Sequence, residues 1–238
     1  MRLLELTLPS PAENLALDEA LLLDAEDGAA GEVLRLWEFP RPVVVLGAGC
    51  RLRENVNEEA CHADAVPILR RASGGGTVLW GHGCLLFSLV LRCDRSPELT
   101  QIMSSYRHIL GRIAAALAAD GVQAEQAGTS DLAIAGRKFS GNAQQRKRSH
   151  FLHHGTLLYG FDLAQVGRYL LPPPRQPEYR DGRAHTDFLC NLPIGRDDLK
   201  RRLRDLWRAD RTVDSWLEDR VVQLVRDKYS TEAWIRRR

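Results

Sequence analysis

The sequence predicts an α/β protein of the α+β kind, in which helices flank a mixed and largely antiparallel sheet. Several expected strands follow one another with only short turns between them, which favours antiparallel neighbours. Helical patterns occur at a few places and do not alternate regularly with strands, so a βαβ series is not expected. The 238 residues, of which 44% are hydrophobic, suit one domain or one domain with a small appendage.

The first half of the chain opens with a strand and a helix. Leu3 to Leu8 alternates as a strand does. Ser10-Pro11-Ala12-Glu13 then combines an N-cap serine, a proline in the first turn and a glutamate that closes a capping box, which predicts a helix to about Asp24. We expect further strands at 32–39, 43–46, 66–71, 77–80 and 85–91, with turns at 40–42 and 81–83.

The second half begins with the clearest helix. Ser96-Pro97 starts it, apolar residues recur at three- and four-residue spacing, and Gly121 ends it. The segment from Pro172 to Asn191 is polar and long for a loop, which indicates either a functional loop or partial disorder. We expect strands at 122–126, 131–135 and 155–159, and helices at 163–170, 197–209 and 213–229.

Charge and cysteine content argue against several classes of protein. A net charge of +2 does not make a polycation, and the basic runs lack interleaved aromatic residues, so we expect no nucleic-acid partner. The five cysteines form an odd set without C-x-x-C spacing, which argues against zinc and against a disulfide framework. The charged N-terminus and the absence of a long apolar span predict a cytoplasmic protein with reduced thiols and no membrane partner.

Three consecutive glycines, Gly74 to Gly76, stand between two expected strands. Such a run loses much conformational freedom on folding, so it is usually kept where a ligand passes close to the backbone. Its N–H groups can face an anion, and Arg70 or Arg71 can add charge-assisted hydrogen bonds. Strand alternation places only one of these two arginines on the ligand side. A glycine-rich hairpin without a ligand fits the local sequence equally well, and the spacing is not that of a Walker loop or a dinucleotide fingerprint.

A second glycine-flanked segment carries Lys138. A lysine held on a strand can bridge a carboxyl oxygen and a phosphate oxygen, and so favour an acyl-phosphate bond; a solvated surface lysine is the alternative. Asp131 precedes a strand and can either hold Mg²⁺ or cap a turn. His153 and His154 are adjacent, so on a strand they point to opposite faces and do not form a metal pair. Cys190 can act as a nucleophile if its pKa is lowered, although a small buried hydrophobe is the favoured interpretation.

Taken together, these motifs resemble the lipoate–protein ligase A family. The likeness rests on Arg-Arg-x-Ser-Gly-Gly-Gly-x-Val from Arg70, on Asp131-Leu132, on Gly-x-Lys-x-Ser-Gly-Asn-Ala from Gly136, and on His-His-Gly-Thr-Leu-Leu from His153. It extends from about residue 10 to about residue 195. The resemblance implies a catalytic core like that of biotin protein ligases. It also implies that lipoate or octanoate reacts with ATP to give acyl-AMP and pyrophosphate, and that the acyl group then passes to a protein lysine.

The resemblance also implies roles for individual residues and for partners. Lys138 would be the catalytic residue that contacts the acyl carbonyl and the phosphate, and Asp131 would help to place Mg²⁺. The implied cofactors are ATP and Mg²⁺, and the implied partner is a lipoyl carrier domain, such as that of an acyltransferase E2 subunit or an H-protein. The acyl group and the nucleotide would be bound by Arg71, Ser73, Gly74, Gly75, Gly76, Thr77, Lys138, Ser140, Gly141, Asn142, Ala143, His154 and Gly155.

The chain departs from the family pattern in two respects. Where relatives often carry His-Asp and then Asn, this sequence has Trp80-Gly81 and Cys84, which alters the nucleotide contacts expected at that turn. Many ligases also have a C-terminal accessory domain. Here we expect a catalytic domain over residues 1–195 and only a short basic helical extension over 196–238. A separate accessory subunit is therefore considered as a further partner.

Two other functions stay open at this point. An ATP-independent transferase of the same superfamily would move an octanoyl or lipoyl group between carriers through a cysteine thioester, with Cys190 as the nucleophile. A non-catalytic protein would bind the lipoylated carrier without turnover. The ligase is favoured because the Lys138 segment and Asp131-Leu132 are more typical of the adenylating branch.

Overall fold

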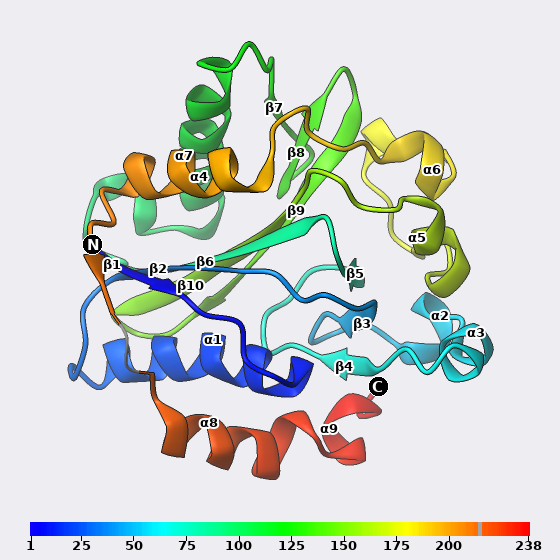
Figure 1. Cartoon of the computed structure of the whole chain (residues 1–238), viewed down its shortest axis with the longest axis horizontal. Helices are drawn as coiled ribbons and strands as arrows, with labels where there is room; N and C mark the ends of the chain where they lie inside the picture. Colours follow the sequence, from blue (N-terminus) through cyan, green and yellow to red (C-terminus); the bar gives the residue numbers. More distant parts are fainter. Residues whose placement is uncertain (214–215) are drawn as a thin grey trace.

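The computed structural model describes residues 1–213 and 216–238. Over these residues, helices cover both faces of a large sheet and a small second sheet lies beside it (Figure 1), which confirms the predicted fold class. The large sheet contains, in spatial order, β11 (Arg211–Thr212), β1 (Arg2–Glu5), β2 (Val33–Trp37), β6 (Cys84–Arg92), β10 (His150–Leu158), β9 (Arg137–Arg146), β8 (Asp131–Ile134) and β7 (Glu125–Ala127). The small sheet contains β4 (Ile68–Arg70), β3 (Val43–Leu46) and β5 (Val78–Trp80).

Strand pairing in the large sheet is antiparallel from β2 through β6, β10, β9 and β8 to β7, whereas β1 pairs in parallel with both β2 and β11. In the small sheet β3 is parallel to β4 and antiparallel to β5. The strand that ends at Arg70 and the strand that starts at Val78 therefore flank the same central strand. This arrangement brings the glycine run between them back over the end of β3.

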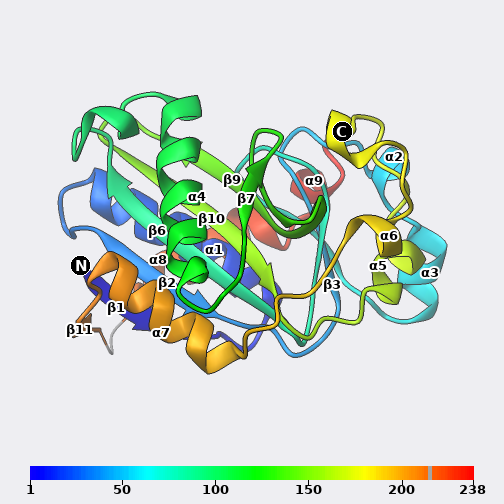
Figure 2. The ribbon, with the colours of Figure 1, turned by 90° about the horizontal axis from the view of Figure 1, so that it is seen from above.

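Two helical layers enclose the large sheet. One face is covered by α1 (Pro11–Glu26), with α8 (Glu218–Leu224) packed against it, and the other by α4 (Ile102–Ala118) and α7 (Arg196–Trp207) (Figures 1 and 2). Each layer has its own apolar cluster, and the sheet separates the two. The shorter helices are α2 (Leu52–Asn55), α3 (Glu58–Ala63), η1 (Pro97–Leu99), α5 (Ala164–Tyr169), η2 (Glu178–Arg180), α6 (His185–Phe188), η3 (Val225–Tyr229) and α9 (Glu232–Ile235).

Local signals placed several helix ends correctly. The capping box is formed: the Glu13 N–H donates to Ser10 Oγ at 3.2 Å, and the Ser10 N–H donates to a Glu13 carboxylate oxygen at 2.8 Å. The helix predicted from Ser96 is instead divided into η1 and α4. It ends as expected, because Gly121 adopts a φ of +75° and the next N–H bonds back to Leu117.

Two stretches differ from the sequence expectation. Residues 137–146 were not expected as a strand, yet they form β9, and β10 starts five residues before the predicted 155–159 strand. In β9 polar side chains occupy both faces, so the alternation that marks a strand in sequence is missing. The strand exists because β8 and β10 satisfy its backbone on both sides.

The predicted helix at 213–229 is wrong at its start. Residues 214 and 215 lie outside the described residues. Val213 donates its N–H to Leu3 and continues the β11–β1 pairing, and helix α8 begins only at Glu218. The segment 172–191 contains η2 and α6, so part of this long loop is helical. None of the described helices has the length and apolar character needed to cross a membrane.

The contribution of the capping box to the stability of α1 can be measured. Replacing Ser10 by Ala removes the acceptor of the Glu13 N–H, so we expect Ser10→Ala to lower the free energy of unfolding by about 1 kcal/mol. Ser10→Asn keeps an N-cap acceptor and is the matched control. Urea unfolding of both variants measures the difference; equal midpoints for Ala and Asn would show that the cap does not stabilise α1.

Candidate functional site

A cavity of about 450 Å³ lies between the two sheets, where four parts of the chain meet. They are the glycine run, the β8–β9 hairpin, the middle of β10, and the segment from Leu171 to Leu189. Of the residues that the sequence predicted for the site, most line this cavity, whereas Ser73, Gly74 and Cys190 do not. Those in the lining are Arg71, Gly75, Gly76, Thr77, Asp131, Lys138, Ser140, Gly141, Asn142, Ala143, His154 and Gly155.

The glycine run is a turn that one buried guanidinium holds together. Arg71 Nη2 donates to the carbonyls of Gly74 at 2.6 Å and Gly76 at 2.8 Å, and its Nε donates to Ser73 Oγ at 3.0 Å. Gly75 has a φ of +82°, which favours glycine. Below it, a Cβ on Gly47 would lie 2.0 Å from the Gly75 carbonyl oxygen, so the two backbones touch. The turn is therefore supported from within the protein by the Arg71 side chain and by the Gly47 backbone.

Arg71 also brings an uncompensated charge to the cavity. It is 6% exposed, and no carboxylate of the described chain forms an ion pair with it. Burial lowers the pKa of Arg71 to about 10, which still leaves the guanidinium charged at neutral pH. A buried cation without a protein counter-ion favours an anionic ligand. The neighbouring Arg70 points away from the cavity and bonds to backbone carbonyls, so only one of the two arginines faces the site, as alternation predicts.

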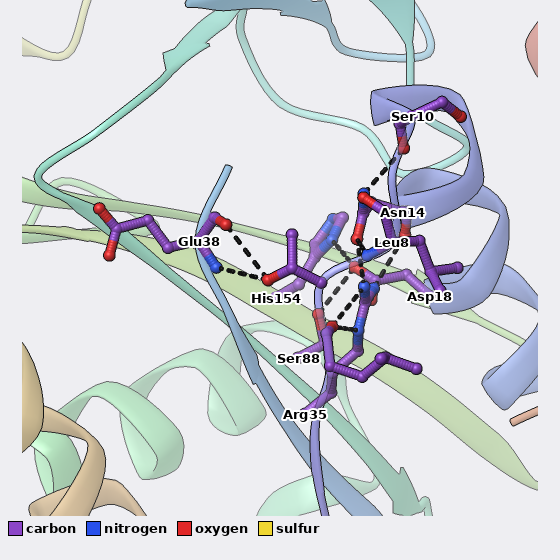
Figure 3. A network of polar contacts seen from close by, with 10 residues as sticks. Leu8, Ser10, Asn14, Asp18, Arg35, Glu38, Ser88 and His154 are labelled. Atoms are coloured by element: carbon purple, nitrogen blue, oxygen red, sulfur yellow. Dashed lines mark hydrogen bonds and ion pairs between the residues drawn. The ribbon is translucent and has the colours of Figure 1, made fainter. Parts of the chain in front are cut away.

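A polar network below the turn orients His154 (Figure 3). His154 Nε2 lies 2.6 Å from Ser73 Oγ, and its Nδ1 lies 3.4 Å from Asp18 Oδ2. Because Ser73 Oγ already accepts from Arg71, we assign the serine proton to the bond with Nε2 and the ring proton to Nδ1. The network thus runs from the glycine turn to a carboxylate on α1.

Asp18 is the anchor of this network and was missed by the sequence analysis. It accepts from Arg35 at 2.7 Å and from Ser88 at 2.7 Å. Burial alone would raise the pKa of Asp18, but the Arg35 charge and the bonds from His154 and Ser88 outweigh burial and lower it. The available signal was a pair of acids, Asp18-Glu19, inside the apolar stretch of α1.

His153 lies on the other side of the sheet from His154, as predicted from their adjacency. Its ring packs against Phe87 and Tyr106, with centroids 6.0 Å and 5.5 Å away. Burial, with a smaller effect of the neighbouring His154, lowers the pKa of His153 to about 3. The residue is therefore a neutral part of the α4-side core.

Lys138 points its ammonium group into the cavity from β9. It forms an ion pair with Asp131 Oδ1 at 2.8 Å, and its side chain is 25% exposed. Tyr179 donates its hydroxyl to the other carboxylate oxygen of Asp131 at 2.7 Å. A Cβ on Gly141 would lie 2.8 Å from Lys138 Nζ, so glycine at this position leaves room for the ammonium group. The lysine is thus held between Asp131 and the cavity.

The donor set around Asp131 does not fit a resident metal ion. Both of its oxygens are already in contact, one with an ammonium group and one with a hydroxyl. In the part of the chain that the structure describes, no group of three or more His, Cys, Asp or Glu side chains suits a metal. A magnesium ion that arrives with phosphates needs fewer protein ligands, because the phosphates supply oxygens of their own.

The segment from Leu171 to Leu189 adds cations that the sequence analysis did not name. Arg180 is 4% exposed and packs over the Phe188 ring, with 4.9 Å between guanidinium carbon and centroid. Arg175 lines the cavity as a further cation. His185 lines it too, but burial and the Arg180 charge lower the pKa of His185, so it adds a neutral imidazole. Two polar atoms in the lining, Thr77 Oγ1 and Asn142 Oδ1, are buried and have no hydrogen-bond partner among the described residues. Unsatisfied atoms and cations on one cavity indicate a polar, anionic ligand.

The cysteines offer no activated thiolate at the cavity. Cys190 Sγ donates to the Arg137 carbonyl at 3.3 Å, and burial raises its pKa despite the opposing charge of Arg137. Cys84 is fully buried, and burial raises its pKa far more. Trp80, at the position where relatives differ, lines the cavity and packs edge-on against Trp37 with centroids 4.9 Å apart. The cavity wall at Trp80 is therefore apolar.

Comparison with known proteins places this chain in a family. Residues 10–193 match the lipoyl protein ligase A/B catalytic domain. The chain belongs to this family. A Mycoplasma pneumoniae protein described as a "probable lipoate-protein ligase A" is 34% identical over 161 residues, which are 67% of this chain and 46% of that protein. The octanoyltransferase LipM of Carboxydothermus hydrogenoformans is 32% identical over 68% of this chain and 65% of its own length.

A comparison with solved structures gives a similar fold. A bi-partite lipoate protein ligase of Thermoplasma acidophilum, described together with its E2 lipoyl domain, superposes with a TM-score of 0.82 at 24% identity. The match covers 99% of this chain and 95% of the archaeal one. The chain spans about half the length of the Mycoplasma relative that it matches. Both the ligase and the transferase branches are thus represented among its relatives.

The contact between Gly47 and the turn provides a test of the site geometry. A methyl group there would overlap the Gly75 carbonyl, so we expect Gly47→Ala to destabilise the protein by about 1–3 kcal/mol. Nothing lies within 4 Å of a Cβ on Gly49, which makes Gly49→Ala the matched control. Urea unfolding compares the two; a Gly47→Ala midpoint equal to that of the control would mean that the turn yields without cost.

Proposed function

We propose that this protein is an ATP-dependent lipoate–protein ligase. It activates lipoate or octanoate as acyl-AMP and transfers the acyl group to a lysine of a lipoyl carrier domain. The observation that carries the proposal is the placement of Lys138 and the Arg71-held glycine turn on one cavity, without a carboxylate to neutralise Arg71. Such an arrangement suits a negatively charged phosphate beside a carboxylate.

In this proposal, different parts of the cavity lining bind the two substrates. Its apolar lining, which includes Trp37, Leu79 and Leu86, suits the acyl chain. The glycine turn, Lys138 and Arg180 suit the phosphates of ATP, which binds as its magnesium complex. A volume of about 450 Å³ lies in the range of small-molecule pockets.

Lys138 would act in the first half-reaction. An oxygen of the lipoate carboxylate attacks the α-phosphorus of ATP, and the bond from this phosphorus to the β-phosphate oxygen breaks, releasing pyrophosphate. Negative charge builds on the α-phosphate oxygens and is stabilised by the Lys138 ammonium group. For this the lysine exchanges its contact with Asp131 for one with the phosphate, which its partial exposure permits.

The second half-reaction needs the carrier. The neutral amine of a carrier lysine attacks the acyl carbonyl carbon, the bond to the AMP oxygen breaks, and the amine loses a proton. Lys138 again stabilises the oxygen charge that develops. The Thermoplasma relative, a bi-partite ligase described with its E2 lipoyl domain, supports a carrier partner, and we include a separate accessory subunit in the proposal.

A transferase is the second candidate because an octanoyltransferase is among the relatives. It would carry the acyl group on a cysteine thioester. Cys190 is disfavoured as that nucleophile, since its sulfur faces the Arg137 carbonyl and its pKa is raised.

The ligase proposal predicts a gain of mass. Incubated with lipoate, Mg-ATP and an apo lipoyl domain, the protein should add one lipoyl group to that domain only when ATP is present. Lys138→Met should lower the rate at least about 100-fold, because it removes the charge that stabilises the phosphate. Lys147→Met, on the exposed β9–β10 turn, is the control. Intact mass spectrometry measures the product; equal rates for the two variants would remove Lys138 from the mechanism.

The choice between ligase and transferase rests on Cys190. We expect Cys190→Ser to leave ATP-dependent lipoylation unchanged, because the sulfur does not line the cavity. The same variant is tested with an octanoylated carrier as donor and no ATP. Loss of an ATP-independent transfer that the unaltered protein performs would favour the transferase.

A further inference from the structure

The last residues of the chain lie outside the family match and pack beneath the glycine turn. The match ends at residue 193, whereas α8, η3 and α9 follow it. Figure 1 shows α8 and α9 on the α1 side of the sheet, with the end of the chain close to β4. Helix α9 is in contact with β4, and β4 leads directly into the glycine turn.

Reciprocal hydrogen bonds join α9 to the start of the turn. Trp234 Nε1 donates to the Arg70 carbonyl at 2.8 Å, and Arg70 Nε donates to the Ile235 carbonyl at 2.9 Å. Arg70 is completely buried, and it forms no ion pair among the described residues. Its Nε and Nη1 donate to backbone carbonyls, one of which belongs to α9, whereas its Nη2 has no hydrogen-bond partner among the described residues.

The same arginine holds the loop on which the turn rests. Arg70 Nη1 donates to the carbonyls of Gly47 at 2.9 Å and Cys50 at 2.7 Å. Gly47 touches the Gly75 carbonyl, and the Ala48 N–H donates to the Ser73 carbonyl at 2.9 Å. Displacing Arg70 would thus move Gly47 and Ala48, the two loop residues that contact the turn.

A second connection runs from η3 through α1. Tyr229 donates its hydroxyl to Glu19 at 2.7 Å, and Lys228 forms an ion pair with the same carboxylate at 2.7 Å. Burial and the Glu19 charge raise the pKa of Tyr229 well above its ordinary value, so the hydroxyl remains a donor. Glu19 is the neighbour of Asp18, which holds His154 and through it the turn. A void of about 10 Å³, the size of one water, lies between Tyr229 and the Ala72–Ser73 backbone.

We propose that the segment from Glu218 to Arg237 holds the glycine turn in its binding geometry, with Trp234 and Tyr229 as positioning residues that do not touch the ligand. The segment donates hydrogen bonds to Arg70 and Glu19. Arg70 bonds to the loop that supports the turn, and Glu19 is the sequence neighbour of Asp18, which contacts His154. The kinetic part of its test, the KM and kcat of acyl-AMP formation, rests on the proposed function.

The experiment compares three conservative variants. Trp234→Phe removes the donor to Arg70 and keeps an aromatic ring, and Tyr229→Phe removes the donor to Glu19. Tyr169→Phe is the control, since its hydroxyl donates to Asp64 at 2.9 Å and neither Tyr169 nor Asp64 lines the cavity or contacts the glycine turn. Each protein is assayed for backbone hydrogen exchange over residues 70–77, for its unfolding midpoint, and for the KM and kcat of acyl-AMP formation.

We expect faster exchange over residues 70–77 in Trp234→Phe and Tyr229→Phe but not in the control. The KM for lipoate or ATP should rise about fivefold, the effect of one lost hydrogen bond, with a smaller change in kcat. A lower unfolding midpoint with unchanged exchange over 70–77 and unchanged KM would overturn the proposal and leave a structural role only. If the unaltered protein makes no acyl-AMP, the proposed function fails, whereas hydrogen exchange still decides the inference.

Discussion

The buried ion pair between Asp18 on α1 and Arg35 on β2 is the interaction on which the site depends. Arg35 is completely buried, and its guanidinium also donates to Leu6 and Asn14, so its donors are satisfied by protein acceptors. Removing one member of such a pair leaves a buried charge uncompensated, which is strongly destabilising. The pair therefore fixes α1 on the sheet and, through His154, fixes the glycine turn.

The charges nearer the cavity follow the opposite arrangement. Arg71 and Arg180 are buried beside it, and the described residues provide neither with an ion-pair partner. Lys138 is paired, but with a carboxylate that it can leave for a ligand. The Asp18–Arg35 pair is thus neutralised within the protein, whereas Arg71 and Arg180 at the cavity have no ion-pair partner among the described residues.

The family relationship does not by itself separate ligase from transferase, because relatives of both kinds share this catalytic domain. The difference between the two reactions lies in which group attacks and where the charge develops. A transferase needs an activated thiol at the acyl carbonyl, whereas an adenylating enzyme needs a cation at the α-phosphate. In this chain the cation faces the cavity and the Cys190 thiol does not, which is why the ligase is the preferred proposal.

The sequence by itself determined the features that depend on residues close together along the chain. It predicted the start of α1 from the Ser10 capping box, most of the strands, and that Arg70 and Arg71 would not share a face. Tertiary structure alone decided that polar residues 137–146 form a strand, because that depends on partners on both sides. It also decided that Asp18 and Arg180 line one cavity and that α9 bonds to Arg70 at the start of the turn, since burial and hydrogen bonding join residues far apart in the chain.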